Sequence, residues 1–153
     1  MAFLQAYIPT TTVTLAANTA KTILGAAAAA NQVIKILEQK VSHDGATSTN
    51  APNITEFGRC TFAGAGTNTA VTPSKKDPGR AETIQTTGSK NYTAEPTVIT
   101  AIDPSNVPVY NGLYHYLTPD SRPLIVVGGQ GWVIRLTAAA IVNACGRLEI
   151  EEG

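Results

Sequence analysis

The sequence predicts an all-β protein, an antiparallel β-sandwich of jelly-roll-like architecture with one long polar loop at about residues 64–90. Three observations predict this class. Short runs of β-branched and aromatic residues recur about every 8–12 positions, with turn residues between them. Threonine is abundant, at 21 of 153 residues, and 13 glycines and 9 prolines supply turns. The strands do not alternate with long amphipathic helices, as they would in an α/β fold.

Length and charge limit the possible roles. A chain of 153 residues fits one domain, which we place at residues 10–153 behind an N-terminal arm at residues 1–9. Eleven basic and eleven acidic residues cancel, so there is no general electrostatic attraction to nucleic acid or to an anionic membrane. No apolar run approaches the ~20 residues of a membrane span. Residues 1–9 hold no Lys or Arg, so we expect no secretory signal and synthesis in the cytoplasm.

The first elements are an apolar segment and a hairpin. Residues 1–9 are nearly uncharged and include Phe3 and Tyr7, so the segment should pack on protein rather than extend into water. It could pack on its own domain or lie on a neighbouring subunit. After it, residues 11–15 alternate β-branched and small side chains, and residues 18–24 can pair with them across an Ala-Ala-Asn turn.

Residues 26–42 fit two structures. The five alanines at 26–30 favour a helix, and the apolar positions that follow have partly helical spacing. Against a helix stand the β-branched residues Val33, Ile34 and Ile36, the missing N-cap and an Asp44-Gly45 turn signal. We therefore predict a long strand at about residues 32–42.

The middle of the chain predicts strands at 54–62, 97–102 and 112–117. Residues 64–90 are rich in Gly, Thr, Ser and Lys without sustained periodicity, which indicates a loop. We expect Asp103-Pro104 and Val107-Pro108 to break the chain between the two later strands.

The last third predicts a hairpin and a final strand. Residues 124–127 and 132–137 flank a Gly-Gly-Gln-Gly turn, with Trp132, Ile134 and Leu136 on one face. Residues 145–151 place Leu148 and Ile150 inward, and Arg147, Glu149 and Glu151 outward.

No catalytic, cofactor or metal site can be assembled from these residues. Ser42, His43 and Asp44 are consecutive, and neighbouring side chains on a strand point to opposite faces, so they cannot form a triad relay. Two histidines, with Cys60 and Cys145 far apart in sequence, lack the spacing of a zinc site. We predict that the protein is not an enzyme, needs no cofactor or metal, and keeps two separate thiols.

Two groups of side chains are candidates for contacts with other molecules. Lys75, Lys76 and Arg80 form the one basic cluster, which is either simply solvated or faces an acidic partner surface. Tyr110, Tyr114 and Tyr116, around His115, could line a sugar-binding face, although tyrosine is also common in ordinary strands.

Three stretches carry a resemblance to a known group of proteins. They are TVTLAANTA at 12–20, the long stretch from Val33 to Asp44-Gly45, and PLIVVGG at 123–129 followed by VIRL at 133–136. Together they resemble small virion proteins of tailed bacteriophages, in particular β-sandwich capsid decoration (cement) proteins.

The resemblance implies a structural role without catalytic residues. Such proteins are commonly homotrimers on the exterior of the capsid, at three-fold or quasi-three-fold points, where they clamp neighbouring major capsid proteins. The implied contacts with subunits or capsid are the 64–90 loop, the N-terminal arm and the residues Phe3, Tyr7, Lys75, Lys76 and Arg80. Related sandwiches in phage tails suggest the alternative of a receptor- or glycan-binding module.

Overall fold

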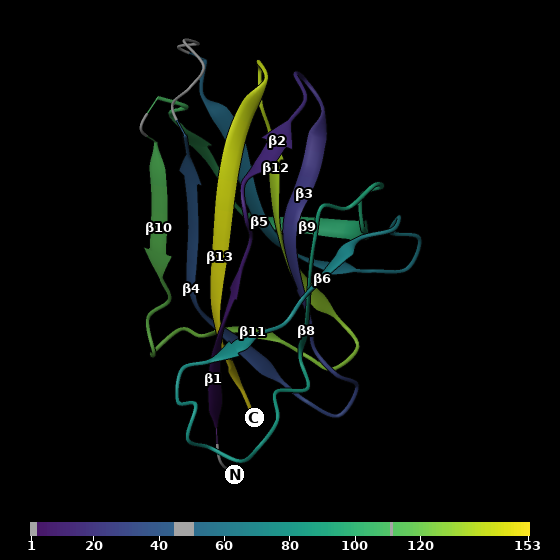
Figure 1. Cartoon of the computed structure of the whole chain (residues 1–153), viewed down its shortest axis with the longest axis vertical. Helices are drawn as coiled ribbons and strands as arrows, with labels where there is room; N and C mark the ends of the chain where they lie inside the picture. The colour runs from purple at the N-terminus through teal and green to yellow at the C-terminus, as the bar shows by residue number, and fades with distance from the viewer. Residues whose placement is uncertain (1–2, 45–50, 111) are drawn as a thin grey trace.

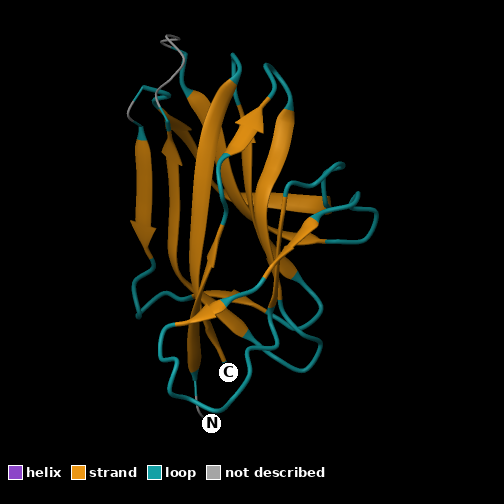
Figure 2. Ribbon diagram, in the orientation of Figure 1, coloured by secondary structure: helices purple, strands orange, loops and turns teal. Residues whose placement is uncertain are grey.

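Two antiparallel sheets pack face to face in the computed structural model of the chain (Figures 1 and 2). The structure describes residues 3–44, 51–110 and 112–153, and in these ranges it contains thirteen strands and no helix. The predicted all-β sandwich is confirmed. The described residues include no helix long and apolar enough to cross a membrane.

The larger sheet has seven strands in the order β10-β4-β13-β1-β7, with β11 also paired to β4 and β2 to β13. Its strands are β1 (Leu4–Pro9), β2 (Val13–Leu15), β4 (Ile34–His43), β7 (Ser74–Lys75), β10 (Leu113–Leu117), β11 (Leu124–Val126) and β13 (Val142–Glu152). The six-stranded sheet has the order β6-β8-β3-β12-β5-β9. Its strands are β3 (Ala20–Ala27), β5 (Asn53–Thr61), β6 (Thr69–Val71), β8 (Thr87–Lys90), β9 (Thr97–Val107) and β12 (Gly131–Thr137).

The principal strands have jelly-roll topology. Along the chain, β1, β3, β4, β5, β9, β10, β12 and β13 mostly alternate between the sheets. They form two four-stranded layers, β10-β4-β13-β1 and β3-β12-β5-β9, which is the double-sheet arrangement of a jelly roll. Strands distant in sequence therefore become neighbours in space.

The core lies between the sheets and is centred on Trp132. Trp132, Ile134 and Leu136 of β12 are fully buried and face the seven-stranded sheet, where Leu148 and Ile150 of β13 are fully buried. These inward faces confirm the alternation predicted for both segments. The Trp132 Nε1–H donates to Gln39 Oε1 of β4 across the core, at 3.1 Å.

Several predicted strands are confirmed, including the ambiguous one. The strand predicted at about residues 32–42 corresponds to β4, Ile34–His43, in which side chains alternate toward the core on either side of an irregularity at Leu37 and Glu38, and β13 pairs along its length. The strands predicted at 54–62 and 112–117 correspond to β5 and β10. Gly45 of the Asp44-Gly45 turn signal lies outside the described residues, and so do residues 1 and 2 of the N-terminal segment.

Both predicted hairpins are wrong. β2 pairs with β13 while β3 pairs with β12 and β8, so the turn through Asn18 (φ 54°) connects the two sheets. In the same way β11 pairs with β4, and β12 pairs with β3 and β5. The turn through Gly129 (φ 79°) is present, yet it leads from one sheet to the other.

The break predicted at Asp103-Pro104 is also wrong, because β9 continues through it to Val107. β9 is the last strand of its sheet, and proline is tolerated on an edge strand because its missing N–H can face away from the neighbour. The break at Val107-Pro108 is confirmed as the end of β9.

The segment at 64–90 is largely irregular, as predicted, but contains the short strands β6, β7 and β8. Its last part is anchored by Glu152, whose buried carboxylate accepts hydrogen bonds from the backbone N–H groups of Gln85 and Thr86. The Thr86 hydroxyl donates to the same carboxylate at 2.6 Å. The loop is thereby held against the C-terminal strand.

The N-terminal segment packs on its own domain. Residues 4–9 form β1, which pairs with β13 along its whole length and with β7 at Ala6 and Tyr7. Of the two alternatives considered for this segment, the structure shows the intramolecular one.

Candidate functional site

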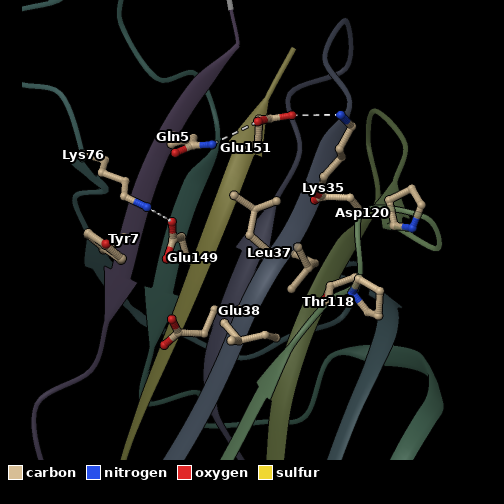
Figure 3. A pocket seen from close by; sticks show the side chains of 14 residues that line it. Gln5, Tyr7, Lys35, Leu37, Glu38, Lys76, Thr118, Asp120, Glu149 and Glu151 are labelled. Carbon is tan, nitrogen blue, oxygen red and sulfur yellow. Dashed lines mark hydrogen bonds and ion pairs between the residues drawn. The ribbon is translucent and has the colours of Figure 1, made fainter.

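The outer side of the seven-stranded sheet carries a depression of about 690 Å³ (Figure 3). Its floor is formed by β1, β4 and β13, and its rim by Lys76 and residues 117–123. We call this region the charged sheet face, defined by the side chains that carry its contacts: Gln5, Tyr7, Lys35, Glu38, Lys76, Arg147, Glu149 and Glu151.

Strand alternation and register explain why these side chains meet. On β13, Leu148 and Ile150 point into the core, so Arg147, Glu149 and Glu151 point outward. The register places Glu149 beside Tyr7 of β1 on one side and Glu38 of β4 on the other. A β-bulge in β4 lies next to Glu38, where the pairing with β13 shifts.

Each glutamate of the face has a cationic partner. Lys35 Nζ lies 2.9 Å from Glu151 Oε1, and Lys76 Nζ lies 2.6 Å from Glu149 Oε1. Glu38 accepts a hydrogen bond from Arg147, and His115 Nε2 lies 3.5 Å from the same carboxylate. The charges of the face thus neutralise one another.

Two aromatic rings extend this network. The Tyr7 ring centre lies 5.8 Å from Lys76 Nζ and 5.1 Å from the Arg147 guanidinium carbon. The Phe3 ring centre lies 4.7 Å from Lys35 Nζ. At exposed sites such cation–π contacts contribute about 0.5–1 kcal/mol each. The two rings therefore add weak stabilising contacts to the ion pairs of the face.

The electrostatics of the face favour the ionised form of Glu38 and Glu151. Burial opposes ionisation of Glu38, but the hydrogen bond and charge of Arg147, with a smaller contribution from His115, outweigh it, so the pKa of Glu38 lies below its ordinary value. Lys35 chiefly lowers the pKa of Glu151, against the opposing effect of burial. A general acid must hold its proton near neutral pH, and these two carboxylates are ionised there.

The five predicted contact residues come together around β1. Lys75 lies in β7, beside Ala6, and its Nζ donates to the carbonyl oxygens of Arg80 and Glu82. Arg80 Nη1 donates to the Phe3 carbonyl at 2.7 Å. Lys75 and Arg80 therefore hold the 76–82 loop on β1. Phe3, Tyr7 and Lys76 remain on the surface, with Phe3 49% exposed.

Sequence reasoning missed Lys35 and Glu38 as members of the face, and His115 as a neighbour of Glu38. The outward positions of Arg147, Glu149 and Glu151 were predicted from alternation, but their partners lie on other strands. Which lysine meets which glutamate depends on register, and register is not visible in the local pattern.

The other candidates do not form a site in the structure. His43 is buried beside Asn53, whose Nδ2 lies 3.4 Å from His43 Nδ1, and burial lowers the pKa of His43. Ser42 lies on the opposite side of β4, so no Ser-His relay exists. Within the described ranges, no cluster of three or more His, Cys, Asp or Glu could hold a metal ion.

Tyr114 and Tyr116 lie on the same side of β10, whereas Tyr110 lies outside the strand and does not join them. Tyr114 packs on Phe57, with ring centres 4.7 Å apart, and its hydroxyl donates to Asp103. Tyr110 is exposed outside the strand. Cys60 and Cys145 are free thiols on different sheets, and burial raises the pKa of Cys60 to about 12.

These features define an all-β jelly-roll protein with a self-neutralised charged sheet face. No family model, curated protein or solved structure matches the chain.

Replacing Arg147 with leucine should lower the free energy of unfolding at pH 7 by about 1–2 kcal/mol, because Glu38 loses its strongest partner. The folded pKa of Glu38 is depressed, so this stabilisation is present above its ordinary value of 4.5 and is lost as the pH falls through the folded pKa. Urea denaturation from about pH 7 to about pH 2.5 should show a difference from wild type that is constant above about pH 5 and shrinks below it. A difference that stays constant, or an equal loss in an Arg122→Leu control from the exposed 118–123 loop, would contradict this assignment.

Proposed function

We propose that the protein is a structural virion subunit, a decoration (cement) protein on the exterior of a tailed-phage head that bridges neighbouring major capsid proteins. The observation that carries the proposal is the charged sheet face, a broad surface whose ionic groups pair with one another and whose aromatic rings lie beside cations. Jelly-roll domains are frequent in viral capsids, which supports the same class, although a fold alone does not define a function.

The face has the chemistry of a protein contact surface. Protein interfaces are enriched in aromatic residues and arginine, with a polar rim. Here Tyr7 lies between Lys76 and Arg147, and Phe3 lies beside Lys35. The Lys76 side chain is 48% exposed, so it can reach an acidic group on a partner while Glu149 holds it in place.

Several weak contacts would be enough for tight binding to the head if the subunits act as a homotrimer. Each copy would contact the shell through its own charged sheet face. When one copy is bound, the others bind at a high effective concentration, so the overall affinity greatly exceeds that of one contact.

The proposal is tested by adding purified protein to undecorated heads assembled from the major capsid protein of the same genome. We expect the protein to bind and to raise the temperature at which the heads disrupt. Lys76→Glu should weaken binding about tenfold or more, because it places repulsion at the contact in every copy.

A matched control keeps the charge change and moves it to the other sheet. Lys21→Glu on β3 should bind like wild type. Absence of wild-type binding would overturn the proposed function, and equal weakening by both variants would overturn the assignment of the charged sheet face.

A further inference from the structure

β10 is an edge of the seven-stranded sheet, and no described strand pairs with its outer side. It is the last strand in the sheet order and lies at the outer margin of the molecule, beside β4 (Figure 1). Its sequence, LYHYL, contains no proline, lysine or acidic residue, and Leu113 and Leu117 are 56% and 63% exposed. Flat apolar edges of this kind readily pair with another strand.

The hydrogen-bonding pattern of β10 leaves one set of backbone groups unused. The His43 N–H donates to the Gly112 carbonyl, and the Thr118 N–H donates to the Leu37 carbonyl. In an antiparallel pair, alternate residues bond to the neighbouring strand, so Tyr114 and Tyr116 also bond to β4. The N–H and C=O groups of Leu113, His115 and Leu117 point away from the sheet, and no described residue bonds to them.

The other described edges are guarded. β11 pairs with the same strand as β10, namely β4. The outer edge of β11 is covered by the other sheet, because Arg59 of β5 donates to the Ile125 carbonyl from Nε at 3.2 Å and from Nη2 at 3.0 Å. β9 contains Pro104 and two register shifts. β2, β6 and β7 have three residues or fewer. Short strands, bulges and proline are the usual protections, and β10 has none of them.

The sequence of β10 identifies the partner strand that fits it. Leu113-Tyr114-His115-Tyr116-Leu117 reads the same in both directions about His115. Two copies can pair antiparallel about a two-fold axis at His115. Leu113 of one copy then faces Leu117 of the other, and Tyr114 faces Tyr116. In this pairing the backbone groups of Leu113, His115 and Leu117 bond to the second copy. Each of these residues donates its N–H and accepts at its C=O.

We propose that two copies of this chain associate through β10, forming a continuous antiparallel sheet across a two-fold axis centred on His115. The contact is short, so it is weak and forms at high local concentration. It goes beyond the proposed function because it requires no head or capsid protein. In a trimer, it would join one trimer to the next.

Site-specific cross-linking tests the register. Facing residues of a hydrogen-bonded antiparallel pair have Cα atoms about 5.5 Å apart, within the range of a disulfide. In a Cys145→Ser background, His115→Cys should therefore give a disulfide-linked dimer under mild oxidation. Leu117→Cys is the matched control, since the two copies of position 117 would be about 14 Å apart along the strands. Equal cross-linking of both variants, or none in either, would overturn the proposal.

A charge exchange tests the same contact without cysteine chemistry. A chain with Leu113→Lys and Leu117→Lys, and a chain with Leu113→Glu and Leu117→Glu, should each lose β10 association, because like charges face each other. Mixed together, they should form a heterodimer by sedimentation at about 1 mM total protein, since each lysine then faces a glutamate. Ile54→Lys, on the other sheet, should associate like wild type. No heterodimer in the mixture would contradict the two-fold pairing, whether or not heads bind the protein.

Discussion

Trp132→Ala should lower the free energy of unfolding by about 3–5 kcal/mol, one of the two largest effects expected in this chain. Trp132 is fully buried in the centre of the core, and its removal leaves a cavity that the β-sheets on either side cannot close. It also removes the hydrogen-bond donor that serves Gln39 Oε1. Urea denaturation at pH 7, followed by circular dichroism, measures the change.

A second pair of variants separates the cavity from the lost hydrogen bond. Trp132→Phe keeps most of the ring volume but leaves the buried Gln39 oxygen without its donor, at a cost of about 1–3 kcal/mol. The Gln39 amide nitrogen already has no partner among the described residues. Adding Gln39→Leu should therefore recover part of the loss. If the double variant is no more stable than Trp132→Phe, the hydrogen bond is not the cause.

Glu152→Gln should destabilise the protein by about 2–4 kcal/mol and release the end of the long loop. The carboxylate of Glu152 is buried and accepts from the Gln85 N–H, the Thr86 N–H and the Thr86 hydroxyl. An amide at this position has one acceptor oxygen and brings N–H donors against the Thr86 N–H. Trypsin should then cleave faster after Arg80, which borders the released residues 81–86.

Glu151 provides the matched control, because it is the preceding residue and faces the opposite side of β13. Glu151→Gln affects an outer ion pair with Lys35, whose side chain is 37% exposed, and should cost at most about 1 kcal/mol. Its rate of tryptic cleavage should equal that of wild type. Equal acceleration in both variants would mean that Glu152 does not anchor the loop.

The sequence predicted where strands occur better than which strands pair. Alternation identifies β12 and β13 because each has one face in the core, and this information is local. The predictions of the two hairpins were wrong for the same reason. A tight turn between two strands reads as a hairpin, whereas in this jelly roll the turns at Asn18 and Gly129 lead to the opposite sheet.

Tertiary context also explains the ambiguous segment and the proline. The alanine run before β4 favours a helix by propensity, but residues 26–27 end β3, where β12 pairs with them. Pro104 would break a central strand and is tolerated because β9 is an edge. In both places, the position in the sheet outweighs local preference.

The candidate site was only partly predictable. The sequence predicted Phe3, Tyr7 and Lys76 as candidate contact residues. The pairing of Lys76 with Glu149 depends on β1 lying between β7 and β13, an arrangement that joins distant parts of the chain. Composition and periodicity contain no information on that register.

The central position of β13 has a consequence for how the protein folds. β13 follows all the other strands in sequence and lies between β1 and β4, so the larger sheet cannot form completely until residues 142–152 have been synthesised. Topologies dominated by such distant pairings fold slowly, typically in milliseconds to seconds. Until β13 inserts, the long edges of β1 and β4 are both exposed, and this unfinished state is the stage at which aggregation competes with folding.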